Sequence, residues 1–472
     1  MINKDSILNT DIELPFLSSL NRLPMNFSSW VAFICVGFFI LSPFLVGILC
    51  LIHHNIDYTI YTHPVIISNL IWPISGIAGG VAICIEWKQR FRSIKNNCQW
   101  FYNNPACLCF VALVIWMIIS TSVNGWNPYC QFGDSIHLRF ETIFMQFGYF
   151  LIIFPNALII KDEKKKRFLI RLHEGVSFFL AITAYILWKM QIDSLFFIWT
   201  PSVTAIYSNI NYYGYYLSVS IPLSAGMFVA ESKQRWKWFS MVTMIINTIT
   251  LAYNNTMGAW VACTFAMLFL LITHGILEHK VNRQAVCITM VYLLCLIVTG
   301  AINGNLERNF VQLFGDIFGI ATHSENSDHA GSGRWIIWKR GLTLIADNPL
   351  FGIGFEGVQA RGLKEYAKNT RIHNEYLQYA LFYGIPAGVF YLAGVVGVYL
   401  RGLKKRQHMT PATLVCLTGA FGYLVSAFFG VTLFCTTPFL FIYLGMGYVT
   451  DSMDRVELQT CEEIRYRKNP GT

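Results

Sequence analysis

Apolar runs of about 20 residues alternate with short polar segments along almost the whole chain. A helix of that length crosses the roughly 30 Å hydrocarbon core of a bilayer. The pattern therefore predicts an all-α fold, a polytopic membrane helix bundle with about twelve transmembrane helices. The predicted spans cover residues 30–52, 65–86, 106–123, 140–160, 172–189, 210–230, 238–254, 257–277, 285–303, 375–400, 411–430 and 433–450.

The polar segment of residues 304–372, between the ninth and tenth predicted spans, is far longer than any other. Loops beyond about 15 residues are usually functional or disordered. This one contains GRWIIWKRGLTLIADNP, in which apolar side chains recur at helical spacing with basic ones between them: Trp335, Trp338, Leu342 and Ile345. The pattern predicts an amphipathic helix at the outer headgroup level, anchored by its tryptophans. NPLFGIGF then predicts a turn, and EGVQARGLKEYAKN a second short helix.

The composition agrees with a membrane protein. Of the 472 residues, 54% are hydrophobic and only 13% are charged, about half the charged share of an ordinary soluble domain. No separate soluble domain is visible. The N-terminal segment is polar and lacks the pattern of a cleavable signal, so we expect a short cytoplasmic tail there.

The formal charge of +9 would suggest a nucleic-acid partner in a soluble protein, but its distribution indicates topology instead. With the N-terminus inside, 25 of the 35 Lys and Arg residues fall on the cytoplasmic side, as the positive-inside rule requires for both termini inside. The predicted organisation is a cytoplasmic tail (1–29), nine spans (30–303), a large extracytoplasmic loop with amphipathic helices (304–372), three spans (373–450) and a cytoplasmic tail (451–472).

The thirteen cysteines lie mostly inside apolar spans, and the sequence has no CxxC motif. Cys107 and Cys109 lack a histidine at metal-ligand spacing. We therefore predict small apolar residues, with no metal, no cofactor and no disulfide framework.

Candidate chemistry lies in IHNEYLQYALFYGIPAG, where polar residues meet the tenth span. A histidine with a pKa near 6.5 can accept a proton near neutrality, and guanidinium groups bind phosphate oxygens while staying charged. These properties fit a reaction in which a hydroxyl attacks a carbon that carries a phosphate leaving group. His373 would accept the proton of the hydroxyl, and arginines of the basic loop would neutralise the leaving group. A lone boundary histidine is more often a headgroup or helix-end residue, however. Arg371 could equally be an interface anchor, and Glu375 a helix-start residue.

The block SGRWIIWKRGLTLIADNPLFGIGF followed by HNEYLQYALFYGIPAG resembles the signature of the O-antigen ligase and polysaccharide-polymerase superfamily. NINYYGYYL, which contains Asn211, resembles the N-x-N element at the sixth span of these proteins. The predicted layout of twelve spans with one large outer loop is similar as well.

The resemblance implies metal-independent transfer of a glycan from an undecaprenyl-diphosphate carrier to an acceptor hydroxyl of a glycan or lipid-glycan. The reaction would take place at the outer side of the bacterial cytoplasmic (inner) membrane, and membrane lipid is an expected partner. Arg334 would engage the diphosphate and His373 would activate the acceptor, with Asn374 beside it. Asn211 is a further expected substrate-binding residue.

The sequence departs from the family pattern at one position where many members carry a second arginine, in addition to the one that matches Arg334. Many members carry an S-R-G element between the seventh and eighth spans, where this chain has Met257. Arg340 and Arg371 are the candidates to replace the missing cation. The departure favours a polymerase over a strict lipid-A-core ligase.

Two other functions stay open at this stage. A flippase or transporter of lipid-linked glycans should carry ionisable residues near span centres and internal repeats, and neither is evident. A non-catalytic assembly partner would not depend on Arg334 or His373.

Overall fold

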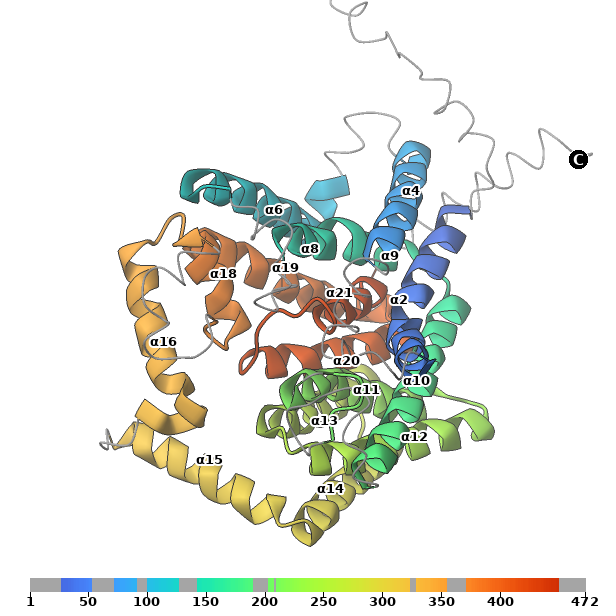
Figure 1. Cartoon of the computed structure of the whole chain (residues 1–472). Helices are drawn as coiled ribbons and strands as arrows, with labels where there is room; N and C mark the ends of the chain where they lie inside the picture. Colours follow the sequence, from blue (N-terminus) through green and yellow to red (C-terminus); the bar gives the residue numbers. More distant parts are fainter. Residues whose placement is uncertain are drawn as a thin grey trace, which may run out of the picture.

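The computed structural model describes residues 27–52, 72–90, 100–126, 142–189, 203–207, 209–322, 328–354 and 371–449. All regular elements in these ranges are helices (Figure 1). They are α2 (Phe27–Ile52), α4 (Trp72–Arg90), α6 (Pro105–Asn124), α8 (Ile143–Gly148), the π-helix η3 (Tyr149–Ile153), α9 (Phe154–Ile159), α10 (Glu163–Lys189), α11 (Ile210–Ala230), α12 (Gln234–Asn254), α13 (Met257–Glu278), α14 (Arg283–Ile302), α15 (Asn305–Ala321), α16 (Ala330–Asp347), α18 (Glu375–Tyr383), α19 (Ile385–Lys404), the short η5 (Arg406–His408), α20 (Pro411–Ala427) and α21 (Thr437–Met446).

The chain forms a polytopic membrane bundle. Among the described residues, six helices are long and apolar enough to cross a bilayer: Phe27–Val46, Pro105–Asn124, Glu163–Ile186, Met257–Leu277, Arg283–Ile302 and Ile385–Lys404. Shorter apolar helices accompany them. Each of the twelve predicted spans overlaps a helix of the bundle.

Helix α11 is the centre of the bundle. It packs against α10, α12, α13, α14 and α20, and residues 213–227 are buried without a break. A helix that is apolar on all sides belongs in such a position. Its N-terminus is fixed by Asn209, whose side chain accepts a hydrogen bond from the backbone of Asn211.

The predicted tenth span is in fact two helices. Residues 375–400 are interrupted at Gly384, which has a φ of 90° and separates α18 from α19. Pro386 in the first turn of α19 cannot donate a backbone hydrogen bond, so a continuous helix is not possible there. The prediction of one continuous span was therefore wrong, although GIPAG contains both breakers.

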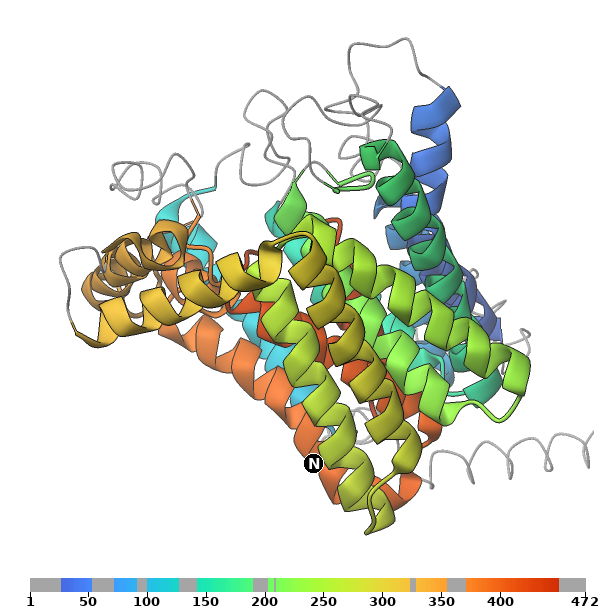
Figure 2. The same cartoon turned by 90° about the horizontal axis from the view of Figure 1, so that it is seen from below.

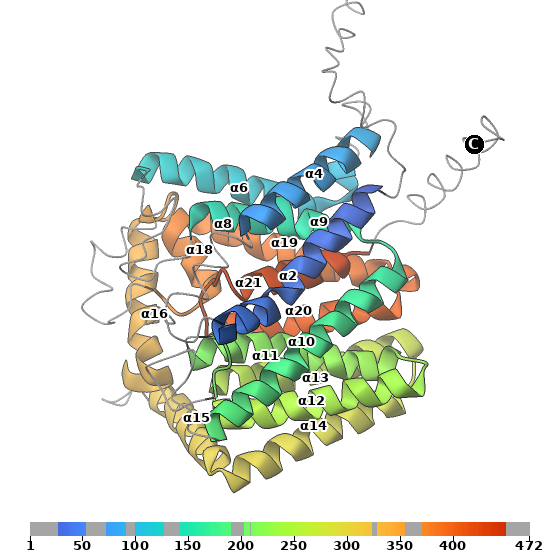
Figure 3. The same cartoon turned by 45° about the vertical axis from the view of Figure 1, so that its right-hand side comes forward.

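Helices α15 and α16 run across one end of the bundle, at a steep angle to the spans (Figures 2 and 3). Both belong to the predicted outer loop. The buried side of α16 consists of Ile337, Gly341, Leu344 and Ile345, while Leu342 is 53% exposed. Of the predicted stripe, Ile345 is therefore buried and Leu342 is not, and Gly341, which has no side chain, lets Ile372 approach closely. That this helix lies at the outer headgroup level stays a prediction. The predicted second short helix, residues 356–369, lies outside the described residues.

The opposite end of the bundle gathers basic residues with carboxylates. Arg167 on α10 bonds Glu163 and Glu231, and Arg171 also pairs with Glu231. These four residues form what we call the α10 cluster. Because Lys and Glu favour helix, α10 begins at Glu163, well before the predicted start at residue 172.

Candidate active site

Arg334 is placed by an unusual entry into α16. Gly331, Ser332 and Gly333 all have left-handed backbone conformations, with φ values of 63°, 60° and 82°. The bend is held by the backbone N–H of Gly331, which donates to the Asp316 carboxylate of α15 at 2.9 Å. Regular helix starts at Arg334, whose guanidinium donates to the Gly331 carbonyl at 3.0 Å.

The short segment of residues 371–374 brings His373 to the same end of the bundle. Arg371 donates from its guanidinium to the Thr432 carbonyl at 3.0 Å. The indole N–H of Trp338 on α16 donates to the Ile372 carbonyl, also at 3.0 Å. His373 itself has a φ of 52°, a left-handed conformation that residues with a side chain rarely adopt. Contacts on both sides of the histidine therefore hold it in a strained position.

Arg334, Arg371 and His373 converge, and we call these three residues the α16 cluster. Burial, and after it the positive charges of Arg334 and Arg371, together lower the pKa of His373 to about 4. The geometry agrees, because Trp338, which bonds the Ile372 carbonyl, follows Arg334 by one turn of α16, and Arg371 precedes His373 by two residues. At neutral pH the histidine is therefore uncharged and can accept a proton.

Beneath the α16 cluster, Glu375 joins four helices. It is the first residue of α18 and is fully buried. Its carboxylate accepts hydrogen bonds from the hydroxyls of Tyr391 on α19 at 2.6 Å and Tyr423 on α20 at 3.2 Å. Tyr423 in turn bonds the hydroxyl of Thr437 on α21. Glu375 does start a helix, as predicted, and it also fixes the base of the site.

The loop between α20 and α21 forms another wall. The Thr432 carbonyl accepts from Arg371, and the Thr432 hydroxyl accepts from the Gln378 amide at 2.7 Å. Tyr215 on α11 donates to the Phe429 carbonyl of the same loop at 3.2 Å. Through this bond α11 borders the loop as well.

The two glycine-containing motifs of the sequence meet beside the site. Ile353, in the turn after α16, donates its N–H to the Leu381 carbonyl at 2.9 Å, and Ile385 donates to the Pro349 carbonyl at 2.7 Å. A side chain at Gly384 would overlap the Leu350 carbonyl, with a Cβ only 1.8 Å from its oxygen. The turn thus fills the break between α18 and α19, and the packing requires glycine there.

A comparison with known families identifies part of the chain. Residues 239–392 match the O-antigen ligase family, a segment that runs from α12 into α19. This segment is an O-antigen ligase family domain. No curated protein shows significant similarity to the chain.

The O-antigen ligase domain contains most of the predicted site residues, and the structure gives them different surroundings. Arg334, Arg371 and His373 come together. Asn374 is 2% exposed, and its side-chain oxygen caps α18 by accepting the N–H of Leu377 at 3.0 Å.

Arg340 lies six residues after Arg334 on α16 and is not among the charges that act on His373. Of the two candidates for the second cation, Arg371 is therefore the one whose charge acts on the pKa of His373. Met257, which stands where many members carry the other arginine, is the first residue of α13 and partly buried.

Asn211 lies outside the O-antigen ligase domain, partly buried in the first turn of α11. It precedes Tyr215 by one helical turn, so the two residues share a face of the helix.

Sequence reasoning missed three residues of the site: Tyr215, Gln378 and Thr432. Tyr215 and Thr432 lie far from the signature block in sequence, so no local pattern connects them to it. Gln378 could have been noticed as an amide inside an apolar helix, since buried amides need partners.

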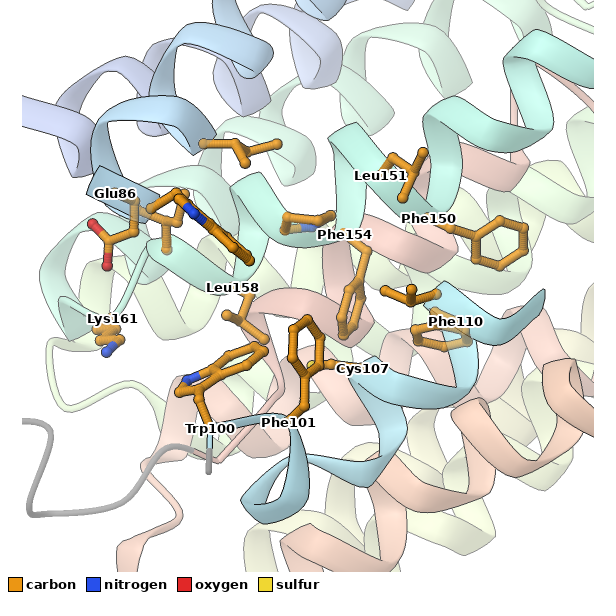
Figure 4. Close-up of a pocket in the computed structure, with 15 residues that line it drawn as sticks. Glu86, Trp100, Phe101, Cys107, Phe110, Phe150, Leu151, Phe154, Leu158 and Lys161 are labelled. Atoms are coloured by element: carbon orange, nitrogen blue, oxygen red, sulfur yellow. The ribbon is translucent and has the colours of Figure 1, made fainter. Parts of the chain in front are cut away.

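The structure also contains an apolar cavity of about 210 Å³ between α4, α6 and α9 (Figure 4). Phe110, Phe154 and Leu158 line it, and Glu86 and Lys161 lie at one side. It shares no residue with the α16 cluster and lies near the start of α6, whereas the α16 end of the molecule contacts the end of α6 through Asn124.

Proposed function

We propose that this protein is a membrane glycosyltransferase that transfers or polymerises an undecaprenyl-diphosphate-linked oligosaccharide onto an acceptor hydroxyl. The O-antigen ligase domain implies lipid-linked glycan substrates. The observation that carries the proposal is the convergence of Arg334 and Arg371 on an uncharged His373 at one end of the bundle.

In the proposed reaction, the acceptor hydroxyl oxygen attacks the anomeric carbon of the donor sugar. The bond between that carbon and the diphosphate oxygen breaks, and undecaprenyl diphosphate leaves. His373 takes the proton of the hydroxyl, while Arg334 and Arg371 neutralise the charge that grows on the leaving group. A bound diphosphate would also offset the positive charge beside His373 and raise its pKa towards neutrality, which makes the imidazole a stronger base.

We propose that the reaction needs no metal ion, because two guanidinium groups can supply the positive charge that a divalent cation would otherwise provide. Among the described residues no group of three or more His, Cys, Asp and Glu side chains is arranged to hold a metal. The test of this point is activity in the presence of excess chelator.

The proposed location of the site is the extracytoplasmic face. The opposite end of the bundle holds Arg167, Arg171 and Lys237, which lie near the starts of α10 and α12. An excess of basic residues marks the cytoplasmic side of a bacterial membrane protein.

The direct test uses purified protein in lipid nanodiscs with an undecaprenyl-diphosphate oligosaccharide donor. We expect elongated or transferred glycan from the wild type and none from Arg334→Ala or His373→Ala. If both variants keep full activity, the site assignment fails. A ladder of products from the donor alone would identify a polymerase, whereas a single transfer to a lipid-glycan acceptor would identify a ligase.

Transport of the lipid-linked glycan is the alternative, and one observation favours it. His173 and Glu174 on α10 are both fully buried, and the His173 imidazole bonds Ser220 on α11 at 2.7 Å. Ionisable residues inside a bundle often mark transport pathways. Translocation of a fluorescent lipid-linked glycan across proteoliposomes, lost in Glu174→Gln and retained in His373→Ala, would support transport over transfer.

A further inference from the structure

Helix α15 exposes its apolar side. The exposed fractions are 52% for Phe310, 68% for Val311, 62% for Phe314, 55% for Ile317 and 69% for Phe318. At 100° per residue these side chains fall on one half of the helix. Five large apolar side chains on one exposed face are far more than scattered surface residues.

The polar side of α15 is the one that packs against the protein. Asn309 is buried and donates to the Asn255 side chain at 2.9 Å. Asn305 donates to the Ala252 carbonyl at 2.9 Å, and Asp316 accepts from Gly331. A surface helix of a water-soluble protein has the opposite arrangement, with its apolar face inward. The inversion shows that the surroundings of α15 are apolar.

The exposed face of α15 continues a lipid-facing surface. Helix α14 is a candidate span, and its last turns expose Ile297, Val298 and Ile302 by 48%, 46% and 76%. Helix α15 begins three residues after α14 ends and turns sharply away from it across the end of the bundle (Figure 2). The exposed apolar side chains of α15 therefore follow those of the span within eight residues of the chain.

We propose that α15 is an in-plane membrane anchor, whose apolar face lies among phospholipid acyl chains of the leaflet at the α16 end of the bundle. Phe310, Phe314 and Phe318 enter the acyl region. The backbone N–H groups of the first turn stay at headgroup level together with Glu307, whose carboxylate the helix N-terminus favours. Sequence analysis assigned such an anchor to α16 instead.

The anchor also sets the depth of Arg334. Asp316 of α15 holds the bend that precedes α16 through the N–H of Gly331, and Arg334 follows three residues later. An anchored α15 therefore keeps this guanidinium at the level of lipid phosphates. This consequence rests on the proposed function, whereas the anchor itself does not.

Photocrosslinking tests the anchor without any assay of glycan transfer. p-Benzoyl-phenylalanine is placed at Phe314 in the full-length protein, in nanodiscs of phosphatidylethanolamine and phosphatidylglycerol. The matched control carries the same probe at Gln312, which is also exposed but points about 200° away around the helix. After irradiation we expect about tenfold more phospholipid adduct at position 314 than at position 312, by mass spectrometry, because only position 314 faces acyl chains.

Equal lipid adducts at the two positions, or none at position 314, would overturn the anchor. Crosslinking of position 314 to a second copy of the chain would show a protein interface there and overturn it too. Two further variants keep the probe at position 314 and test the apolar face itself. Phe318→Glu, which places a charge on that face, should lower the lipid adduct severalfold, whereas Gln312→Glu should leave it unchanged.

Discussion

Two arginine clusters lie at opposite ends of the bundle, and they differ in what neutralises them. In the α10 cluster, Glu231 is buried and pairs with both Arg167 and Arg171, and Glu163 adds a second carboxylate. In the α16 cluster, Arg334 and Arg371 donate to backbone carbonyls. Among the described residues no carboxylate forms an ion pair with either of them.

The difference separates a structural cluster from a binding one. Arginines that already pair with carboxylates bind a further anion weakly, because their positive charge is largely neutralised. Arginines held by neutral carbonyls keep their full charge and gain free energy when an anionic group arrives. This contrast gives the α16 cluster its proposed role towards a diphosphate and leaves the α10 cluster a role in stability.

The largest effect should come from the histidine between the two arginines. His373→Asn should lower kcat by about a thousandfold, because general-base catalysis contributes in that range. Asparagine tolerates the left-handed backbone, so the fold should survive. Turnover and the unfolding temperature in nanodiscs measure the two effects.

The chain provides a matched control for this variant. His279 also has a left-handed φ, of 51°, at the end of α13, and is exposed at the other end of the bundle. His279→Asn should keep wild-type turnover. If turnover fell equally in His279→Asn and His373→Asn, the loss would follow from replacing a histidine at a left-handed position, and a specific role of the His373 imidazole would be ruled out.

The same substitution, arginine to glutamine, should have opposite effects in the two clusters. Arg371→Gln should lower kcat about a hundredfold with little change in stability, because a group that stabilises the leaving anion is lost. Arg171→Gln should cost about 1–3 kcal/mol of unfolding free energy, because the buried Glu231 loses a partner. Activity per folded molecule should not change in Arg171→Gln. A stability loss in Arg371→Gln alone would reverse the comparison.

A smaller effect should follow from adding a carboxylate to the α16 cluster. Gln378 shares Thr432 with Arg371, so Gln378→Glu places a carboxylate near that guanidinium. The new anion should compete with the diphosphate and lower kcat/KM about tenfold, with partial recovery at higher salt if the site admits ions. Gln312→Glu, at an exposed position of α15, adds the same charge elsewhere and should have no effect. An unchanged kcat/KM in Gln378→Glu would show that Arg371 does not meet the donor.

The smallest expected effect is on the pH profile. With the pKa of His373 at about 4, the imidazole of the free protein is uncharged from pH 8 down to about pH 5. The ratio kcat/KM should therefore stay constant over that range and fall only as the pH approaches 4. Arg371→Gln removes one of the charges that lower this pKa, so the fall should begin at a higher pH. A wild-type profile that already falls near pH 6.5 would contradict the environment described for His373.

The spans could be predicted because hydropathy is a local property of about 20 residues. The span of residues 375–400 was predicted wrongly, because a window of that length averages over Gly384 and Pro386, where α18 ends and α19 begins. FVQLFGDIFGIA, the sequence of residues 310–321 in α15, has an amphipathic pattern that the prediction of spans does not detect.

The candidate site was predictable only in part. The pairing of Arg334 with His373 came from the resemblance and stays a prediction, which the effect of Arg334 on the pKa of His373 supports. The preference for Arg371 over Arg340 rests on the same effect and on the contact of Arg371 with the loop after α20, which no local pattern indicates. Glu375 was underestimated, because its partners Tyr391 and Tyr423 belong to other helices and no local pattern indicates them.

The break at Gly384 has a consequence for how the chain enters the membrane. Helix α19 alone has 20 residues, enough to cross the bilayer. The insertion machinery can therefore accept a segment that starts at Ile385, and the nine residues of α18 can fold onto it afterwards. Because α18 need not cross, Glu375 can meet Tyr391 and Tyr423 after these helices are in place, with its carboxylate satisfied on burial.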